Sequence, residues 1–362
     1  MKRAVSVSVL VLTTTLLAGC SHSSKPKAAS SPTPSPTAAA SEDPRPTVDA
    51  TPTTTHAAAP VGPAGTKVPS GFTPMSATFI SDRTGWVLGS SPCPSGKGRC
   101  DVIARTHDGG ATWLAIPSPA TGPDHLAQIR FAGERDGFVT GDQLWATHDG
   151  GATWHVVRNS DVQLAAAGGR AWISQDGRLY SASAAGGAFA LEASGSQVQS
   201  FAVRAGEAIY SDGTSLFRLP HAGSPHRVAV PCSSGASPVV GLGSSTHWFL
   251  VCEGDAGLGH QDKQAFQSLD AGASWKPAGT PPSLTGTDIY VTGEGTFVVD
   301  HQEIAVYRSG SWQPVLRTDG GVNEGGFESA ALGYCIGGFG NQSAAEMKLT
   351  HDAGRSWRTV AF

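Results

Sequence analysis

The chain has 362 residues, of which 15% are charged, and its 25 Lys and Arg against 29 Asp and Glu give a net charge of −4. This small charge, with no polybasic block beyond the first residues, argues against nucleic acid or an anionic bilayer as an electrostatic partner. The 46 glycines and 24 prolines indicate many turns rather than long helices.

Residues 1–19 have the three parts of a secretory signal peptide. Lys2 and Arg3 precede the apolar stretch Val5 to Leu17, and small residues follow before Cys20. Because the apolar stretch is too short to span a bilayer, we expect this segment to be removed on export.

The junction Leu17-Ala18-Gly19-Cys20 resembles the lipobox of bacterial lipoproteins, in which the cysteine receives a diacylglyceryl group and becomes the new N-terminus. The resemblance implies acyl chains such as palmitate on Cys20, and two chains suffice for stable anchoring. We therefore expect a protein held at the cell membrane with its folded part extracytoplasmic. The alternative is an ordinary signal peptide with an incidental cysteine.

Residues 20–67 form a segment of Pro, Ser, Thr and Ala with almost no large apolar side chain. Such a segment cannot bury enough surface to offset its ordering entropy, which predicts a disordered, partly polyproline-II tether. Its reach is about 40 Å as a coil and about 140 Å when fully extended.

Residues 68–362 show no capped helical periodicity and instead contain short alternating segments bounded by Gly, Asp and Ser turns. Gln128-Ile129-Arg130-Phe131 and Thr296-Phe297-Val298-Val299 are examples. This pattern predicts one all-β domain, and a stretch of this length supplies a sizeable core.

An eight-residue motif recurs four times in this domain. Thr106-His107-Asp108-Gly109-Gly110-Ala111-Thr112-Trp113 returns unchanged in the octet that holds Asp149 and Trp154. It returns with changes in the octets that hold Asp270 and Trp275, and Asp352 and Trp357. Its Asp is expected to accept backbone N–H groups of its own turn, its glycine to take a positive φ, and its Trp to begin the next strand.

A second element, Gly85-Trp86-Val87-Leu88-Gly89, lies upstream of the first octet and is echoed at residues 137–141 and 333–337. Each unit therefore reads as strand, turn, strand, strand, octet, strand, which is the four-stranded blade of a β-propeller.

The spacing of the octets counts the blades. Trp113 and Trp154 are 41 residues apart, whereas Trp154 and Trp275 are 121 apart, or about three periods. Trp312 ends a degenerate octet between Trp275 and Trp357. Two blades without a clear octet are expected at residues 162–191 and 198–230, so the total is seven, with six or eight as alternatives.

The octets resemble the Asp box, Ser/Thr-x-Asp-x-Gly-x-Thr/Ser-Trp, of the sialidase-like BNR-repeat propellers. Together with the Gly-Trp-Val-Leu-Gly strands, they are similar to the non-enzymatic branch related to photosystem II stability factors and Vps10/sortilin. In these families the box lies on outer turns away from the ligand face, so the resemblance implies a structural role for the best-matched residues.

An exo-sialidase-type glycoside hydrolase is the enzymatic alternative. That family needs three arginines around a carboxylate, a Tyr nucleophile with its Glu, and an Asp acid/base. Phe217-Arg218-Leu219-Pro220 resembles its Phe/Tyr-Arg-Ile-Pro motif but falls after two octets instead of before the first. A carboxylate clamp in this chain would have to combine Arg218 with Arg130 and Arg204. Because the motif falls at a different place than in sialidases, a non-catalytic module is favoured.

Cysteines and histidines are the candidates for covalent and metal chemistry. Cys93 and Cys100 flank one turn, and Cys232 and Cys252 are expected on neighbouring strands of the fifth unit, so both pairs are candidate disulfides in an oxidising envelope. Cys335 is left over as a buried thiol. His107, His148 and His351 share one octet position, and we expect solvent-facing turn residues with no metal, since neighbouring outer turns lie too far apart for shared coordination.

A ligand of such a ring is expected at the central channel, on innermost strands and inter-blade loops. Candidate binding residues there are Gln128, Arg130, Arg204, Asp288, Tyr290, and, before the last blade, Asn323 and Glu324. The sequence thus predicts a cell-surface lipoprotein that presents a propeller, without cofactor, for binding or assembly of an unidentified protein or glycan. A third candidate role is an extracytoplasmic sensor or scaffold partner of a membrane complex.

Overall fold

The computed structural model describes residues 62–121, 127–193, 197–204, 206–257, 260–282, 286–338 and 345–362. The expected signal peptide, Cys20 and most of the expected tether lie outside the described residues. Within the described ranges all regular structure is β-strand, and no helix there is long and apolar enough to cross a membrane.

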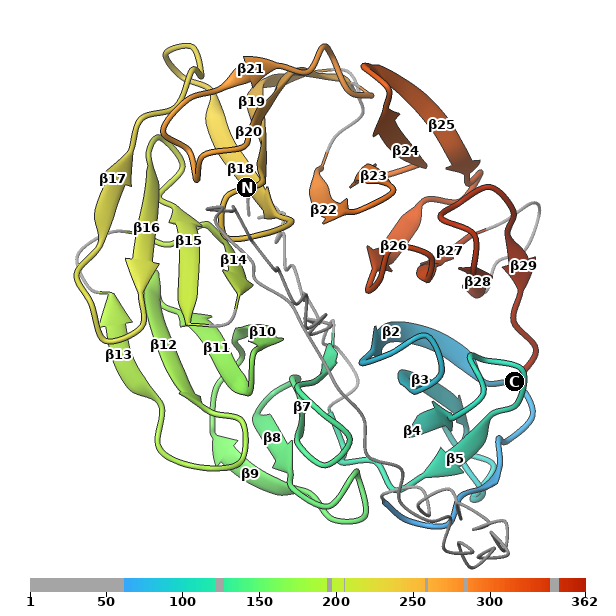
Figure 1. Ribbon diagram of the computed structural model, residues 1–362. Coiled ribbons are helices and arrows are strands. Elements are labelled where there is room, and N and C mark those ends of the chain that lie inside the picture. Colours follow the sequence, from blue (N-terminus) through green and yellow to red (C-terminus); the bar gives the residue numbers. More distant parts are fainter. Residues whose placement is uncertain are drawn as a thin grey trace, which may run out of the picture. The chain divides into compact units, whose positions relative to one another are not determined.

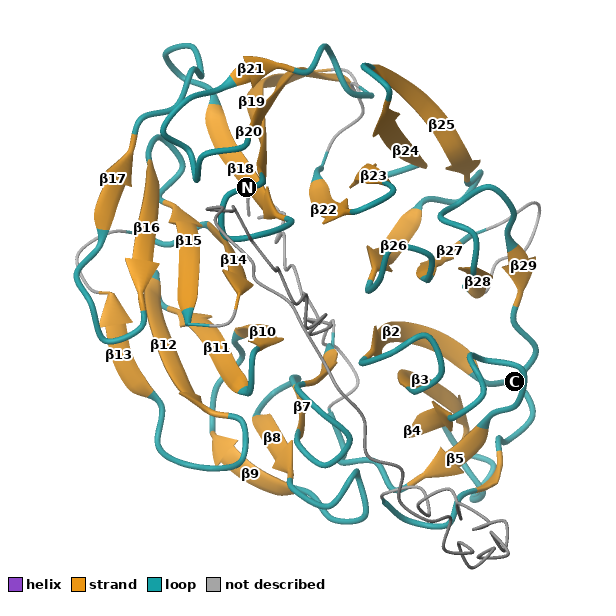
Figure 2. Cartoon of the chain, viewed as in Figure 1, coloured by secondary structure: helices purple, strands orange, loops and turns teal. Residues whose placement is uncertain are grey.

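Seven antiparallel sheets follow one another along the chain and stand around a common centre (Figure 1; Figure 2). The strands of the first three blades are β2 (Thr73–Phe79), β3 (Gly85–Pro92), β4 (Arg99–Thr106), β5 (Leu114–Ile116); β6 (Ile129–Phe131), β7 (Gly137–Val139), β8 (Leu144–Thr147), β9 (His155–Arg158); β10 (Gln163–Ala167), β11 (Arg170–Gln175), β12 (Arg178–Ser183) and β13 (Ala190–Ala193).

Blades 4 to 7 continue the same order. Their strands are β14 (Ser200–Arg204), β15 (Glu207–Ser211), β16 (Leu216–Pro220), β17 (His226–Val228); β18 (Ser237–Leu242), β19 (Trp248–Gly257), β20 (His260–Ser268), β21 (Lys276–Pro277); β22 (Asp288–Thr292), β23 (Gly295–Val299), β24 (Glu303–Arg308), β25 (Ser311–Arg317); β26 (Val322–Phe327), β27 (Gly333–Gly337), β28 (Glu346–Thr350) and β29 (Arg358–Thr359). The predicted seven-bladed propeller is confirmed, and the two blades without a clear octet are blades 3 and 4.

The four strands of each blade run from the innermost to the outermost in sequence order, and blade 1 has one more strand outside them. Because neighbouring strands are antiparallel, the turns between strands one and two and between strands three and four share one face of the ring. We call it the octet face, since the four octets are turns between strands three and four. The hairpins between strands two and three and the inter-blade linkers lie on the other face, which we call the linker face.

The blades pack through aromatic side chains at the ends of the innermost strands. Phe131 of blade 2 stacks on Trp86 of blade 1 with ring centroids 3.8 Å apart, and Phe327 of blade 7 stacks on Phe297 of blade 6 at 3.5 Å. The recurring glycine at the start of strand two makes room for these rings. A Cβ atom at Gly137 would lie 2.5 Å from the Phe131 ring, so this position admits no side chain.

The four octets form the same hydrogen-bonded turn. In the second, Asp149 Oδ1 accepts from Thr147 Oγ1 at 2.8 Å and from the Thr153 amide at 3.0 Å, and its Oδ2 accepts from Thr153 Oγ1 at 2.6 Å. Gly151, at φ 91°, donates its amide to Thr147 Oγ1. The Trp154 indole donates to the Pro117 carbonyl of blade 1 at 3.0 Å, so the tryptophan bridges two blades instead of covering only its own sheet.

Asp149→Ala is expected to lower the free energy of unfolding by roughly 1–3 kcal/mol, because it leaves turn donors unpaired. Burial raises the pKa of Asp149, but the bonds from Thr153 outweigh this and hold it at about 2. The stabilisation is therefore present above pH 4 and is lost as the pH falls towards 2. Urea titration of the wild type and Asp149→Ala at pH 6 and pH 2.5 measures this loss of stability, and Asp161→Ala, at an exposed residue, is the control. A loss of the same size at both pH values would contradict the expectation.

Among the strands that the structure describes, none is exchanged between the first and last blades of the ring. Strand β1 (Thr66–Lys67), from the end of the expected tether, adds to the outer edge of β5 in blade 1. Blade 7 meets blade 1 through side chains: Arg358 Nη2 donates to the Gly109 carbonyl at 3.0 Å, and the Phe362 ring lies 4.6 Å from that of Phe72. Closure therefore depends on non-covalent contacts across this one joint.

Candidate functional site

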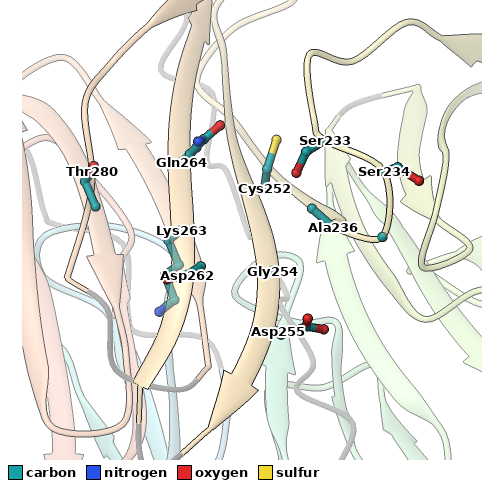
Figure 3. Close-up of a pocket in the computed structure, with 11 residues that line it drawn as sticks. Ser233, Ser234, Ala236, Cys252, Gly254, Asp255, Asp262, Lys263, Gln264 and Thr280 are labelled. Atoms are coloured by element: carbon teal, nitrogen blue, oxygen red, sulfur yellow. The ribbon is translucent and has the colours of Figure 1, made fainter.

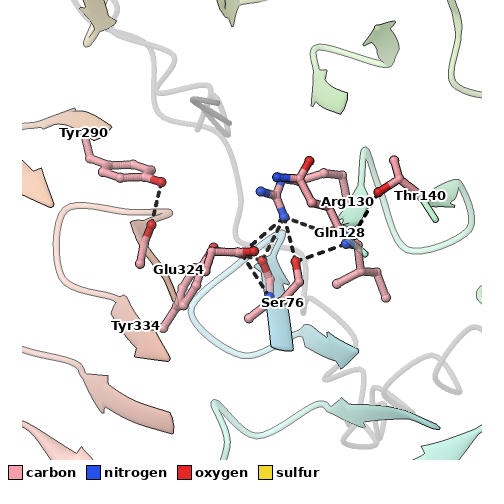
Figure 4. A network of polar contacts seen from close by, with 10 residues as sticks. Ser76, Gln128, Arg130, Thr140, Tyr290, Glu324 and Tyr334 are labelled. Carbon is pink, nitrogen blue, oxygen red and sulfur yellow. Dashed lines mark hydrogen bonds and ion pairs between the residues drawn. The ribbon is translucent and has the colours of Figure 1, made fainter. Parts of the chain in front are cut away.

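A buried polar network joins blades 7, 1 and 2 at the inner rim of the ring (Figure 4). Arg130 on β6 is 5% exposed, and its Nη1 donates to the Ile129 carbonyl at 2.7 Å and to Ser76 Oγ at 3.1 Å. The same nitrogen lies 3.3 Å from Glu324 Oε1 on β26, which also accepts from the Ala77 amide at 3.1 Å. One ion pair thus connects the first two blades to the last.

Two tyrosines complete the network. The Tyr334 hydroxyl on β27 lies 2.8 Å from Glu324 Oε1 and 2.9 Å from the Ala77 carbonyl, and its single proton is shared between these acceptors. The Tyr290 hydroxyl on β22 donates to the Gly325 carbonyl at 2.5 Å, which links blade 6 to blade 7. We call Ser76, Arg130, Tyr290, Glu324, Glu328 and Tyr334 the ring clasp.

Backbone bulges place the clasp residues. Among the seven pairs of innermost and second strands, only β2–β3 and β26–β27 change register, between Pro74 and Ser76 and between Val322 and Glu324. The extra residues Met75 and Asn323 shift the side-chain alternation that follows them, as bulges do. Ser76 and Glu324 come immediately after these bulges and face Arg130.

The clasp is electrically balanced at neutral pH. Burial raises the pKa of Glu328 to about 8 although the Arg130 guanidinium opposes it, so this carboxyl stays largely protonated. Burial also raises the pKa values of Tyr290 and Tyr334 well above their usual range. The remaining charges are the paired Arg130 and Glu324. A buried, internally bonded set of this kind holds strands together and offers little to a ligand.

Of the seven expected binding residues, the structure brings three together, and Arg204 at the end of β14 is one of the four that lie apart. Arg130, Tyr290 and Glu324 meet in the ring clasp. Gln128 precedes β6, Asp288 begins β22, and Asn323 lies within β26 with its side chain exposed. Asn323 and Glu324 therefore belong to the first strand of the last blade, and not to the segment before it as expected.

The three arginines that the sialidase alternative requires as a carboxylate clamp do not lie together. Arg204 ends β14 and donates to the Gly243 carbonyl at 3.1 Å, whereas Arg218 lies on the third strand of blade 4 and pairs with Glu207 at 2.7 Å. Only Arg130 meets a Glu and a Tyr, and that tyrosine, Tyr334, is 2% exposed. The geometry required for the sialidase alternative is therefore not assembled.

Two clefts lie side by side over blades 4 and 5 on the linker face, with volumes of about 470 and 590 Å³. The loop Ser233–Ala236 forms a wall of both. The first cleft is also lined by Cys252, Asp255 and Asp262 of the β19–β20 hairpin and by Thr280 (Figure 3). Sequence reasoning did not find these clefts, because their walls come from a linker and a hairpin that match no repeat.

Both expected disulfides are formed. Cys93–Cys100 closes the tip of the β3–β4 hairpin, and Cys232–Cys252 fixes the linker before β18 to strand β19. Cys232 therefore lies in a linker, and not on a strand as expected. The second disulfide holds the loop between the two clefts against the hairpin.

Replacing Cys232 and Cys252 together by serine is expected to lower the free energy of unfolding by roughly 3 kcal/mol, because the loop they close is no longer restricted in the unfolded chain. The disulfide between Cys93 and Cys100 closes a shorter loop, so the double replacement of these two cysteines is the matched control. It should lower the free energy of unfolding less, by roughly 2.5 kcal/mol. Urea midpoints under non-reducing conditions give both values. An equal or reversed order would contradict the expectation.

Other residues considered for chemistry lie apart. His351 is exposed as expected, but His107 and His148 are only partly exposed, and His148 Nδ1 lies 2.9 Å from Asp136 Oδ1. The expectation that the three histidines face solvent is therefore corrected for these two. Among the described residues no three His, Cys, Asp or Glu side chains are grouped to hold a metal ion. Cys335 on β27 is a buried free thiol, and burial raises its pKa to about 12, so it is a poor nucleophile.

No protein-family model matches the chain, and a search of curated proteins finds no match. Solved structures that it resembles include YCF48 bound to D1 peptide, with a TM-score of 0.53 and 14% identity over 80% of this chain and 96% of that one. A catalytically inactive virginiamycin B lyase from Staphylococcus aureus with quinupristin gives a TM-score of 0.54 and 12% identity over 79% of this chain and 98% of that one.

A third structure, the β-propeller domain of the Trilobed protease from Pyrococcus furiosus, described as having an open velcro topology, gives a TM-score of 0.50 and 7% identity over 78% of this chain and 95% of that one. At such identities the likeness establishes the fold alone. The chain is a seven-bladed β-propeller protein with disulfide-braced hairpins on its linker face.

Proposed function

We propose that this chain is an exported lipoprotein whose propeller is a non-catalytic binding module for a segment of another protein. The observation that carries the proposal is the pair of clefts on the linker face, next to the longest hairpin of the ring. The residues of the ring clasp bond to one another and are buried, whereas these two clefts are open to solvent. A propeller of similar fold, YCF48, was solved bound to a peptide, which shows that this architecture can serve such a role.

Site-specific photo-crosslinking in cells tests this proposal. p-Benzoylphenylalanine replaces Ser234 or Asp255 beside the clefts, and Ala111 or Ala273 in octets on the opposite face serve as controls, all four being exposed. We expect the same discrete adduct from both cleft positions and none from the octet positions. Adducts from the octet face alone, or from no position, would refute a binding role for the linker face.

Membrane attachment through Cys20 is proposed from the lipobox-like junction. Cys20→Ser is expected to abolish incorporation of an alkyne-tagged palmitate and to move the protein from the membrane to the soluble fraction, because the thiol is the only acceptor of the diacylglyceryl group. Ser21→Ala, at the neighbouring residue, is the matched control and should leave both unchanged. Labelling that persists in Cys20→Ser would show that the cysteine is incidental.

A further inference from the structure

The two clefts on the linker face share one wall, and this wall is braced. It is the loop Ser233–Ala236, in which the Ala236 amide donates to the Ser233 carbonyl at 3.1 Å and Gly235 has a φ of 89°. The disulfide between Cys232 and Cys252 ties the start of this loop to β19, and Cys252 lines the first cleft while Cys232 lines the second. The two clefts are therefore held at a fixed distance from each other.

The accessible charge of the first cleft is negative. Asp255 and Asp262 line it and are exposed, and among the described residues neither carboxylate takes part in a hydrogen bond or an ion pair. Lys263 lines the same cleft, but its side chain is fully buried, with its ammonium donating to the Gly286 carbonyl at 2.8 Å and lying 3.9 Å from Asp300. The cleft thus presents two free carboxylates, whose complement is a basic side chain.

The second cleft presents the opposite charge. Arg227 is the one charged residue among those that line it, it is exposed, and within the described part of the chain its side chain makes no hydrogen bond. Asp212 interacts with Arg227 electrostatically, but the two form no ion pair there, and Asp212 Oδ1 accepts from the Thr214 and Ser215 amides at 2.9 and 2.8 Å. The Arg227 guanidinium can therefore pair with a carboxylate of a bound molecule.

The lining of the clefts favours a protein segment over a sugar or another small molecule. Neither cleft has an aromatic side chain among its lining residues, most of which are small. Sites for drug-sized molecules are lined predominantly by hydrophobic and aromatic side chains. Two clefts of opposite charge on either side of a four-residue loop suit two side chains that project from one extended chain.

We propose that the two clefts together bind an extended segment of a partner protein that carries a Lys or Arg and, a few residues away, an Asp or Glu. The basic side chain lies beside Asp255 and Asp262, the acidic side chain pairs with Arg227, and the segment crosses the loop Ser233–Ala236. Because these charges are exposed, they give specificity and orientation more than affinity. This inference rests on the proposed binding function and names its partner chemistry.

Selection of phage-displayed random dodecapeptides on the membrane-extracted protein in nanodiscs tests the inference. The two most enriched peptides are then measured by fluorescence anisotropy. We expect each peptide to carry a basic and an acidic residue at one preferred separation, because the braced loop fixes the distance between the clefts. Binding of both peptides should weaken as the salt concentration rises, because the paired charges are accessible to solvent.

Reversing the charge of each cleft assigns its side chain. Asp262→Lys should weaken binding about tenfold, and a peptide whose basic residue is replaced by Glu should restore it. Arg227→Glu should also weaken binding about tenfold, with recovery when the acidic residue of the peptide is replaced by Lys. Asp161→Lys and Arg178→Glu reverse exposed charges elsewhere on the linker face and, as controls, should change the affinity less than about twofold. Recovery by an exchanged charge cannot come from a misfolded variant.

Enrichment of no peptide, enrichment without the paired charges, or a loss of binding that the exchanged peptides do not restore would each overturn the inference. Reversal variants that bind as tightly as the two controls would do the same. If photo-adducts form at Ser234 and Asp255 while the selected peptides lack the paired charges, the proposed binding function stands and only this partner chemistry is excluded. Adducts that map to a second copy of this chain, or to its own residues 20–61, would assign the clefts to that occupant instead.

Discussion

Replacing Arg130 with leucine is expected to lower the free energy of unfolding by about 3–5 kcal/mol, because it leaves the Glu324 carboxylate buried without its cation. Arg130 is 5% exposed and makes four hydrogen-bond contacts that join blades 7, 1 and 2. Since no strand is exchanged between the first and last blades, we expect the loss to appear at that joint. Urea unfolding gives the energy, and hydrogen exchange at β2 and β26 gives the location.

A matched arginine distinguishes the clasp from an ordinary ion pair. Arg317 pairs with Glu303 at 2.7 Å, but its side chain is 75% exposed. Arg317→Leu should therefore cost less than about 1 kcal/mol. Changing Arg130 and Glu324 together to leucine should recover part of the loss, because no unpaired charge remains. Similar effects for the two single arginine variants would contradict the assignment of a clasp.

Stability is expected to fall as the pH rises from about 4.5 to 8, because of Glu328. Burial raises the pKa of this carboxyl from 4.5 to about 8, whereas Arg130 lowers it less. Between these values the unfolded chain has released the proton that the folded chain retains, so unfolding is favoured by increasing pH. The decrease in the free energy of unfolding caused by Glu328 reaches up to about 5 kcal/mol near pH 8 and is absent below pH 4.5.

Glu328→Gln isolates this contribution, since the amide has the same shape and does not ionise. The difference in urea midpoint between this variant and the wild type should be small at pH 4.5 and should grow in favour of the variant by pH 8. Glu346→Gln, at a half-buried carboxyl on β28, is the control and should show no such growth. A pH-independent difference for Glu328→Gln would show that the carboxyl ionises normally in the folded protein.

The repeat was sufficient to predict most of the fold. Octet spacing gave seven blades and located the two blades without an octet, because a blade is built from contiguous sequence and its turn residues bond within eight positions. Trp154 shows where this local reasoning ended, since its indole bonds to Pro117 of the preceding blade. Inter-blade contacts depend on how sheets pack, and no local motif records them.

The sequence by itself determined the blade and its turns, because these depend on neighbours close along the chain, and it offered the two cysteine pairs as candidates among other connectivities. Only the tertiary structure decided what Arg130 does, since its partner Glu324 is 194 residues away and is brought near by ring closure. The same holds for the two clefts, whose walls combine a linker with a hairpin. Ring closure and blade packing thus bring polar residues from distant parts of the sequence together in the ring clasp.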